Sequence, residues 1–200
     1  MSKKGVFIVI EGLDGSGKTT QATLLANKLS KTCEVLCTAE PSRGKIGTFI
    51  RHGCLYEEKR LPTEAEALLF AADRIEHMKN ELAPALFQGK TVICDRYIYS
   101  SLAYQGSAGL SLAWIKTINA RALQPDFSIF IDVSPEQVLK RLKRKKSVME
   151  TLEIQQKVRE IYLKFVEEGE LILIDGDKQR DVVAEALFTK VLSLLKNINY

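Results

Sequence analysis

The stretch Gly12–Thr19 constrains this chain more than any other feature. It reads GLDGSGKT and fits the pattern G-x-x-x-x-G-K-[ST] at every position. An unbroken apolar run, Val6–Ile10, precedes it, and a helix is predicted over Lys18–Ser30. Glycines let the backbone curl so that successive N–H groups converge on a phosphate, which the positive end of the following helix also attracts. The sequence therefore predicts a strand, a phosphate-binding loop and a helix, in that order.

The residues of this loop have separate expected tasks. Lys18 is expected to reach the β- and γ-phosphates of a nucleoside triphosphate, and the hydroxyl of Thr19 to ligate Mg²⁺. ATP is the expected phosphoryl donor and Mg²⁺ the expected cofactor. The loop residues expected to bind ATP are Gly12, Leu13, Asp14, Gly15, Ser16, Gly17, Lys18 and Thr19.

Short β-branched and aromatic runs alternate with helical segments along the rest of the chain. Strands are predicted at Gly5–Ile10, Glu34–Ala39, Lys90–Cys94, Phe127–Val133 and Glu170–Ile174. Helices are predicted at Lys18–Ser30, Gly47–Glu57, Thr63–Gln88, Leu112–Leu123, Glu136–Lys145, Leu152–Glu168 and Asp181–Asn197. Continuous apolar runs indicate strands buried on both faces, and their alternation with helices indicates a parallel sheet. We expect an α/β three-layer sandwich of the P-loop NTPase type, with a five-stranded parallel sheet flanked by helices and ligands at the carboxyl ends of its strands.

Composition narrows the class of protein further. A chain of 200 residues that is 46% hydrophobic can form one domain, which we place at 1–200. Its 29 basic and 25 acidic residues leave a net charge of +4, too little to indicate a nucleic-acid partner. No stretch approaches the roughly 18–20 apolar residues that span a bilayer, so no membrane association is expected. The cysteines lack the spacing of a zinc site and indicate the reduced thiols of a cytoplasmic protein.

A carboxylate and an arginine follow the predicted strand Lys90–Cys94. Asp95 would lie beside the phosphate loop, where it can hold Mg²⁺ directly or through water. Arg96 can grip a phosphate with two parallel hydrogen bonds. A plain turn that closes a core strand is the alternative. Asp132, near the end of Phe127–Val133, is a rival for the metal, but we favour Asp95 because an arginine and a tyrosine follow it.

The predicted helix Thr63–Gln88 carries an aromatic residue one turn from an arginine. A helical projection gives one apolar stripe, expected to face the core: Ala65, Leu68, Leu69, Ala72 and Ile75. Phe70 and Arg74 lie on the opposite side, where they could stack on a nucleobase and hydrogen-bond to it. The alternative is a helix buried on both sides with Phe70 in the core. His77 is expected at the surface.

Five segments together resemble the thymidylate kinase family, over essentially the whole chain. Glu11–Thr20 resembles its phosphate loop, Glu40-Pro41 its Glu-Pro turn, Phe70–Arg74 its thymine-side helix, Asp95–Tyr97 its DR(Y/H) motif and Tyr104–Gly106 its YQG signature. The resemblance implies a kinase that uses ATP to convert dTMP to dTDP. It also implies a homodimer, the usual state of family members.

The resemblance assigns the dTMP site to Asp14, Glu40, Phe70, Arg74, Arg96, Tyr104 and Gln105. It implies that Phe70 stacks on thymine while Arg74 and Gln105 hydrogen-bond to its edge. It places Tyr104 against the sugar and Asp14 at the 3′-hydroxyl, and it leaves the acceptor phosphate to the arginine of the DR(Y/H) motif.

Six cations occur between Lys140 and Lys146. The phosphate loop carries no cation at Gly15-Ser16 to stabilise the migrating phosphoryl group, and family members of this kind bring one from a mobile lid. We therefore expect a short basic lid at about 141–151. Within it, Arg144 would join Lys18, Asp95 and Arg96 as a catalytic residue, and Arg141 would lie on adenine. A solvated surface run is the alternative.

One departure from the family pattern concerns the acceptor side. Ala39 stands where many bacterial members carry an arginine before the Glu-Pro turn. Arg43, on the other side of that turn, is the candidate replacement. The loop Asp175–Lys178, after the last predicted strand, is expected to contact adenine through its backbone.

Other functions remain open from the residues alone. The phosphate of dTMP is already mostly dianionic near neutral pH, so its phosphorylation needs no general base. A deoxynucleoside kinase would need one, and Glu40 is the candidate. A GTPase switch would need an Asn-Lys-x-Asp motif, whereas the Asn27-Lys28 pair lies inside the first predicted helix. A non-catalytic nucleotide-binding module is the third alternative.

Overall fold

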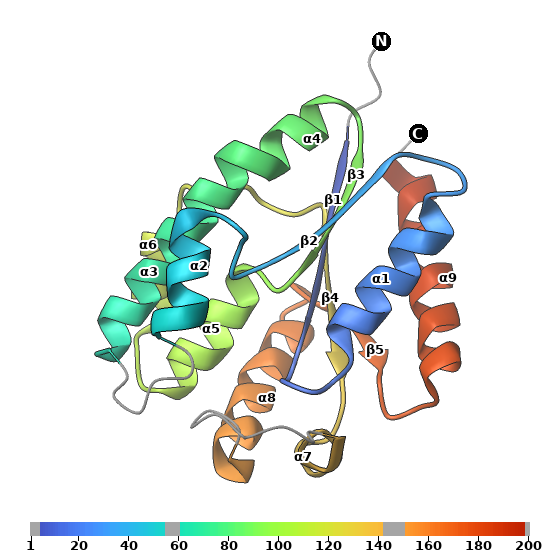
Figure 1. Cartoon of the computed structure of the whole chain (residues 1–200). Coiled ribbons are helices and arrows are strands. Elements are labelled where there is room, and N and C mark those ends of the chain that lie inside the picture. The colour runs from blue at the N-terminus through green and yellow to red at the C-terminus, as the bar shows by residue number, and fades with distance from the viewer. Residues whose placement is uncertain (1–4, 55–60, 142–150, 199–200) are drawn as a thin grey trace.

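The computed structural model describes residues 5–54, 61–141 and 151–198 (Figure 1). The strands are β1 (Val6–Gly12), β2 (Val35–Ala39), β3 (Thr91–Asp95), β4 (Phe127–Asp132) and β5 (Ile172–Asp175). The helices are α1 (Lys18–Leu29), α2 (Lys45–Gly53), α3 (Thr63–His77), α4 (Ala83–Phe87), α5 (Ile98–Ser107), α6 (Leu112–Ile118), α7 (Pro135–Arg141), α8 (Leu152–Glu167) and α9 (Arg180–Ile198), with a π-helical segment η1 (Met78–Leu82) between α3 and α4.

The strands form one five-stranded sheet in the order β2-β3-β1-β4-β5, and every neighbouring pair is parallel. Helices cover both of its faces (Figure 1). α1 and α9 pack together on one face, while α4, α5 and α8 contact the other. α3 and α6 lie outside α5, and α2 packs against α3. The predicted α/β sandwich with its parallel sheet is therefore confirmed.

The central strands are buried on both faces, as their unbroken apolar runs predict. The side chains of Ile8–Ile10 in β1, Val92–Cys94 in β3 and Ile129–Ile131 in β4 are 0% exposed. Helices from the two outer layers exclude water from both faces, so polar alternation would leave buried groups without partners. Among the described residues, no helix combines the length and the apolarity needed to cross a bilayer.

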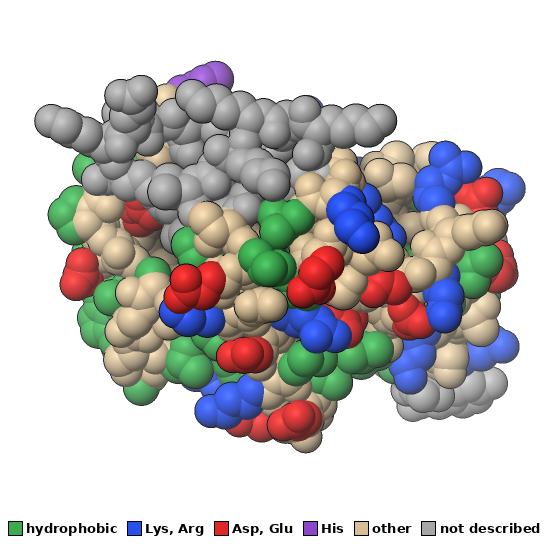
Figure 2. Space-filling model, turned by 90° about the horizontal axis from the view of Figure 1, so that it is seen from below, with side chains coloured by type: hydrophobic (Ala, Val, Ile, Leu, Met, Phe, Trp, Pro, Cys, Tyr) green, Lys and Arg blue, Asp and Glu red, His purple; other side chains and the backbone are tan. Residues whose placement is uncertain are grey.

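The strand registers bring the expected site residues to one edge of the sheet. Ile10 of β1 pairs with Asp95 at the end of β3, and Gly12 pairs with Ile131, next to Asp132 at the end of β4. This is the carboxyl edge, where parallel α/β sheets bind ligands. Figure 2 views the molecule from the side to which this edge points, and the described surface there mixes basic and acidic side chains.

Helix α5 is missing from the sequence prediction, which has no helix between residues 97 and 112. Ser100, Ser101 and a glycine near its end give it a weak intrinsic helix propensity. Burial of Leu102 and Ala103 overrides that weakness. The predicted helix 63–88 is helical from Thr63 to Phe87, although η1 interrupts its α-helical hydrogen bonding.

The predicted core face of α3 is wrong. Leu68 is 50% exposed and Ala72 is exposed, whereas Ala67, Ala71 and Arg74 are buried. The buried face also carries Glu66, Asp73 and His77, so the predicted surface position of His77 is wrong as well. Periodicity separates the two faces of a helix, but it does not say which one the protein covers.

Candidate active site

The phosphate loop leaves β1 through backbone conformations that favour glycine. Gly12, Gly15 and Gly17 have φ angles of 154°, 89° and 93°. A Cβ at Gly12 would also lie 2.7 Å from Ser16 Oγ and 2.8 Å from the carbonyl oxygen of Ile131. Gly17 is the N-cap of α1, so the loop curls directly into the positive end of a 12-residue helix. The predicted strand–loop–helix unit is present.

The side chain of Lys18 lies inside this loop. Its side chain is buried, and Nζ donates a 2.6 Å hydrogen bond to the carbonyl oxygen of Leu13. Burial and the charge of Arg96 lower the pKa of Lys18 to about 8, against the opposing effect of Asp95 and Asp14. A phosphate placed in the loop would supply the anion that this ammonium group lacks.

The residues present fit a hydrated Mg²⁺. The hydroxyl of Thr19 donates to Oδ2 of Asp95, while the other oxygen of Asp95, Oδ1, is buried and finds no hydrogen-bond partner in the described part of the chain. A hard cation that keeps several waters needs few protein ligands, and a carboxylate beside a hydroxyl meets that need. The rival Asp132 is already engaged, because Arg159 donates two hydrogen bonds of 2.7 and 2.8 Å to its two oxygens.

Asp14, Arg96 and Tyr104 form a compact cluster beside the loop. Nη2 of Arg96 lies 2.5 Å from Oδ1 of Asp14, and the hydroxyl of Tyr104 donates to Oδ2 of Asp14 over 3.1 Å. The guanidinium also stacks over the ring of Tyr104, 5.0 Å from its centroid. Burial alone would raise the pKa of Asp14, but the charges of Arg96 and Lys18 outweigh it and lower that pKa to about 2. The cluster joins an ionised carboxylate to a cation that faces the phosphate loop.

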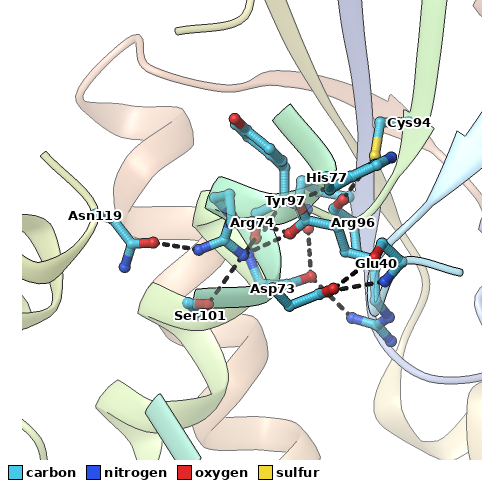
Figure 3. Close-up of polar contacts among 12 residues, drawn as sticks. Glu40, Asp73, Arg74, His77, Cys94, Arg96, Tyr97, Ser101 and Asn119 are labelled. Carbon is cyan, nitrogen blue, oxygen red and sulfur yellow. Dashed lines mark hydrogen bonds and ion pairs between the residues drawn. The ribbon is translucent and has the colours of Figure 1, made fainter. Parts of the chain in front are cut away.

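Arg74 sits at the centre of a second, buried cluster (Figure 3). Its guanidinium donates to Glu40 from Nε over 2.9 Å and lies 2.8 Å from the same oxygen through Nη2. It also donates to Oδ1 of Asn119, to the Tyr97 carbonyl oxygen and to the hydroxyl of Ser101. This arginine is therefore held from four directions, and one N–H of Nη1 has no partner among the described residues.

Glu40 and its neighbours fix the turn that carries Arg43. Oε1 of Glu40 lies 3.2 Å from Nδ1 of His77, so both carboxylate oxygens are occupied. Asp73 accepts hydrogen bonds from the backbone N–H and the hydroxyl of Ser42, at 2.8 and 2.5 Å. Arg43 itself is exposed and has no ion-pair partner among the described residues.

Two residues of the predicted base-binding side retain a group that a ligand could contact. Phe70 is only partly buried and is absent from the hydrophobic core of the described residues. Gln105 is 4% exposed, and none of the described residues donates a hydrogen bond to its Oε1. A buried amide oxygen without a donor is costly in a folded protein unless a ligand or water satisfies it. Both features suit residues that contact a base.

The donor side is described only in part. Arg141, at the end of α7, donates a 3.4 Å hydrogen bond to the carbonyl oxygen of Gly176 and lies 3.8 Å from Asp177. It is thereby placed at the loop expected to contact adenine. Arg144 and most of the predicted lid, 142–150, lie outside the described residues.

Sequence reasoning missed several residues that build these clusters. Glu11, Ser100 and Tyr162 meet at the base of the Arg96 cluster, and Asn119 accepts a hydrogen bond from Arg74. A usable signal existed only for Glu11, which is a carboxylate at the end of an apolar strand and must find partners when buried. Ser100 and Tyr162 lie on helices and Asn119 directly follows one, and the sequences there carry no such mark.

The fold and the site define a P-loop nucleotide-binding protein with a second cationic centre beside its phosphate loop. The family model described as thymidylate kinase matches residues 10–187, and the chain belongs to that family.

Relatives that share much of their sequence with this chain are named as probable thymidylate kinases. The protein from Pyrococcus horikoshii is 49% identical over 172 residues, which cover 82% of this chain and 84% of the relative. The protein from Methanocaldococcus jannaschii is 42% identical over 193 residues, with coverage of 96% and 97%. The protein from Pyrobaculum aerophilum is 41% identical over 194 residues, again with coverage of 96% and 97%.

Proposed function

We propose that this protein transfers the γ-phosphoryl group of ATP to dTMP, giving ADP and dTDP on the route to dTTP. The observation that carries the proposal is the cationic centre at Arg96, which lies beside the phosphate loop and is joined to Asp14 by a 2.5 Å ion pair. Phosphoryl transfer between two phosphates requires a second anion site in line with the first. Family membership supplies the identity of the acceptor.

On the donor side, the loop N–H groups and Lys18 would hold the β- and γ-phosphates. Thr19 and Asp95 would hold Mg²⁺, which neutralises phosphate charge when bound. Arg141 would lie on adenine, and Arg144 would supply the cation that meets the migrating phosphoryl group. No residue need act as a general base, because the dTMP phosphate is already an adequate nucleophile near neutral pH.

On the acceptor side, Phe70 would stack on thymine, and Gln105 would offer its unpartnered Oε1 to a donor on the base edge. Arg74 would use its remaining N–H toward the same edge, with Glu40 holding it in place. Tyr104 would lie against the sugar, where a ribose 2′-hydroxyl would find little room. Asp14 would meet the 3′-hydroxyl, and Arg43 would assist Arg96 at the phosphate.

A coupled assay of ADP release tests the proposal against a deoxynucleoside kinase. Wild-type protein with ATP and Mg²⁺ should release ADP with dTMP and not with thymidine. The engagement of both Glu40 oxygens by Arg74 and His77 argues against its use as a base for a hydroxyl acceptor. Release with thymidine alone would contradict the proposal, and release with neither substrate would indicate a binding module.

Phe70→Ala should weaken dTMP binding by about 1–3 kcal/mol, the usual contribution of base stacking on an aromatic side chain. Its partial exposure predicts a stability loss well below the roughly 3–5 kcal/mol that truncation of a core phenylalanine costs. Calorimetric titration with dTMP and thermal unfolding measure the two effects. Phe87→Ala, which removes an aromatic ring that is 89% exposed, is the control. A large stability loss with unchanged dTMP affinity would return Phe70 to the core.

We further propose that the protein is a cytoplasmic homodimer. The described cysteines are all free thiols, which suits a reducing compartment. α2 and α3 pack together at one side of the molecule (Figure 1) and expose Phe49 at 53% and Leu68 at 50%. Exposed apolar side chains on adjacent helices are typical of a contact between subunits. The outer face of α2 and α3 is therefore the proposed dimer surface.

Leu68→Glu should convert the dimer to a monomer, because it places a charge in the middle of the proposed contact. Light scattering coupled to size-exclusion chromatography measures the mass. Phe87→Glu changes an even more exposed apolar side chain at the end of α4 and should leave the mass unchanged. A Leu68→Glu variant that remains dimeric would place the contact elsewhere.

A further inference from the structure

Glu11 is a buried carboxylate for which the proposed mechanism has no task. It lies in β1, one residue before the last residue of the strand, and is 0% exposed. Its Oε1 accepts hydrogen bonds from the backbone N–H groups of Tyr97 and Ser100, at 2.9 and 3.2 Å. Its Oε2 accepts from the hydroxyls of Ser100 and Tyr162, at 2.6 and 3.0 Å. Burying an ionisable group so completely is costly, and these four donors offset that cost.

The carboxylate caps helix α5 from another strand. The N-cap residue, Tyr97, offers no side-chain hydrogen bond to the free N–H groups of the first turn. Ser100 is the third helical residue, and its N–H is one that a capping side chain normally satisfies. Glu11 does so instead, and its negative charge lies at the positive end of the helix. The Glu11 side chain thus links the N-terminus of α5 to the strand that leads into the phosphate loop.

The same carboxylate also stabilises the turn that carries Arg96. This arginine has a φ of 71°, a left-handed conformation that costs energy in a residue other than glycine. Its N–H donates to the carbonyl oxygen of Ile10 over 3.0 Å, and the next N–H in the chain, that of Tyr97, donates to Glu11. The turn that orients Arg96 is therefore held by two hydrogen bonds, one to the backbone of β1 and one to the side chain of Glu11.

Glu11 also acts on the Arg96 side chain, through the hydroxyl of Ser100. The Ser100 hydroxyl donates its hydrogen bond to Oε2 of Glu11, so its oxygen accepts a 2.9 Å hydrogen bond from Nη1 of Arg96. Without the carboxylate, that hydroxyl could rotate its proton toward the guanidinium, and the bond to Arg96 would be lost. Glu11 thereby orients a hydrogen-bond acceptor for Arg96 as well as the backbone that carries it.

We propose that Glu11 is a positioning residue for the acceptor phosphate, acting on Arg96 through Ser100 and the turn at Tyr97. It touches neither substrate. The inference rests on the proposed function, since the phosphate that Arg96 would grip is that of dTMP. The competing role is support of the phosphate loop, because Glu11 directly precedes Gly12. The two roles predict losses for different substrates. Loss of a positioning residue lowers the affinity for dTMP, whereas loss of loop support raises the KM for ATP.

The experiment compares Ser100→Ala, Glu11→Gln and the double variant with wild type. Glu11→Gln keeps the size of the side chain and removes its charge, and Ser100→Ala removes only the intermediate hydroxyl. Each should lower dTMP affinity about tenfold, the effect of one lost hydrogen bond to a charged group. Thymidine affinity should stay within about twofold, because thymidine lacks the phosphate. The KM for ATP should be unchanged, and the double variant should be no worse than the worse single variant, because both act on one path.

Tyr99→Phe is the matched control. It removes the hydroxyl of the neighbouring residue in α5, which donates to Glu170 at the surface, and it should change none of these quantities. Equal losses of dTMP and thymidine affinity, or a rise confined to the KM for ATP, would overturn the inference. If Glu11→Gln does not fold, Ser100→Ala alone decides it, since unchanged dTMP affinity in that variant contradicts the path. Failure of the proposed function would appear separately, as a wild-type protein that releases no ADP with dTMP.

Discussion

Lys18→Ala should reduce kcat for ADP release with dTMP by ~10²-fold or more while the protein remains folded. The ammonium group is buried in the phosphate loop, and among the described residues its one hydrogen-bond acceptor is the carbonyl oxygen of Leu13, so its charge is available to the bound phosphates. Charge grows on the bridging and γ-phosphate oxygens during transfer, and a fixed cation in a water-excluded site stabilises that charge strongly. Initial rates at saturating ATP and dTMP measure the effect.

The control for this variant is Lys28→Ala on the same helix. Lys28 forms a surface ion pair with Glu185, and such pairs contribute little to stability or to a distant site. Circular dichroism of both variants should match wild type. A folded Lys18→Ala protein that keeps a tenth or more of the wild-type rate would contradict the assignment of the loop to the transferred phosphates.

Arg96→Lys should lower kcat/KM for dTMP by ~10²-fold or more. The guanidinium donates to Asp14 and Ser100 at the same time and leaves other N–H groups for a phosphate, whereas an ammonium group is a single point charge. Two charge-assisted hydrogen bonds of about 1.5–3 kcal/mol each are therefore replaced by one less directional contact. Steady-state kinetics with dTMP as the varied substrate measure the loss.

The KM for ATP should change by no more than about twofold in Arg96→Lys, since loss of the acceptor contact alone leaves the loop intact. Arg121→Lys, an exposed arginine outside both clusters, should behave as wild type in every measurement. An Arg96→Lys variant whose defect lies in ATP binding, with dTMP kinetics preserved, would place Arg96 on the donor side and remove the observation that carries the proposed function.

Local patterns predicted the parts of this protein that depend on local chemistry. The loop Gly12–Thr19 needs glycines for its positive φ angles, so its sequence and its conformation are linked. The unbroken apolar runs predicted the buried strands, because a strand covered on both faces excludes polar groups. Helical periodicity also put Phe70 and Arg74 together on one face of α3, although the protein buries that face and not the one assigned to the core.

The buried face of α3 shows why that assignment failed. Sequence reasoning gave the core to the apolar stripe that contains Leu68, yet the protein buries Asp73 and Arg74 and leaves Leu68 half exposed. Charged side chains can be buried only when partners meet them, and these partners are distant in the chain. Glu40 is 34 residues from Arg74, and Asn119 is 45 residues from it. No local pattern contains that information.

The sequence by itself determined the phosphate loop, the parallel sheet and the family. The tertiary structure alone decided which strand-end carboxylate lies next to Thr19, which face of α3 is buried and how the side chain of Arg96 is oriented. Asp95 and Asp132 both end strands, but in the folded protein the hydroxyl of Thr19 donates to Asp95, whereas Arg159 of α8 occupies Asp132. Glu11 and Tyr162 are 151 residues apart and meet beneath Arg96. Such choices depend on the pairing of buried charges across the fold, because the energy of a buried charge is set by its neighbours in space and not by its neighbours in sequence.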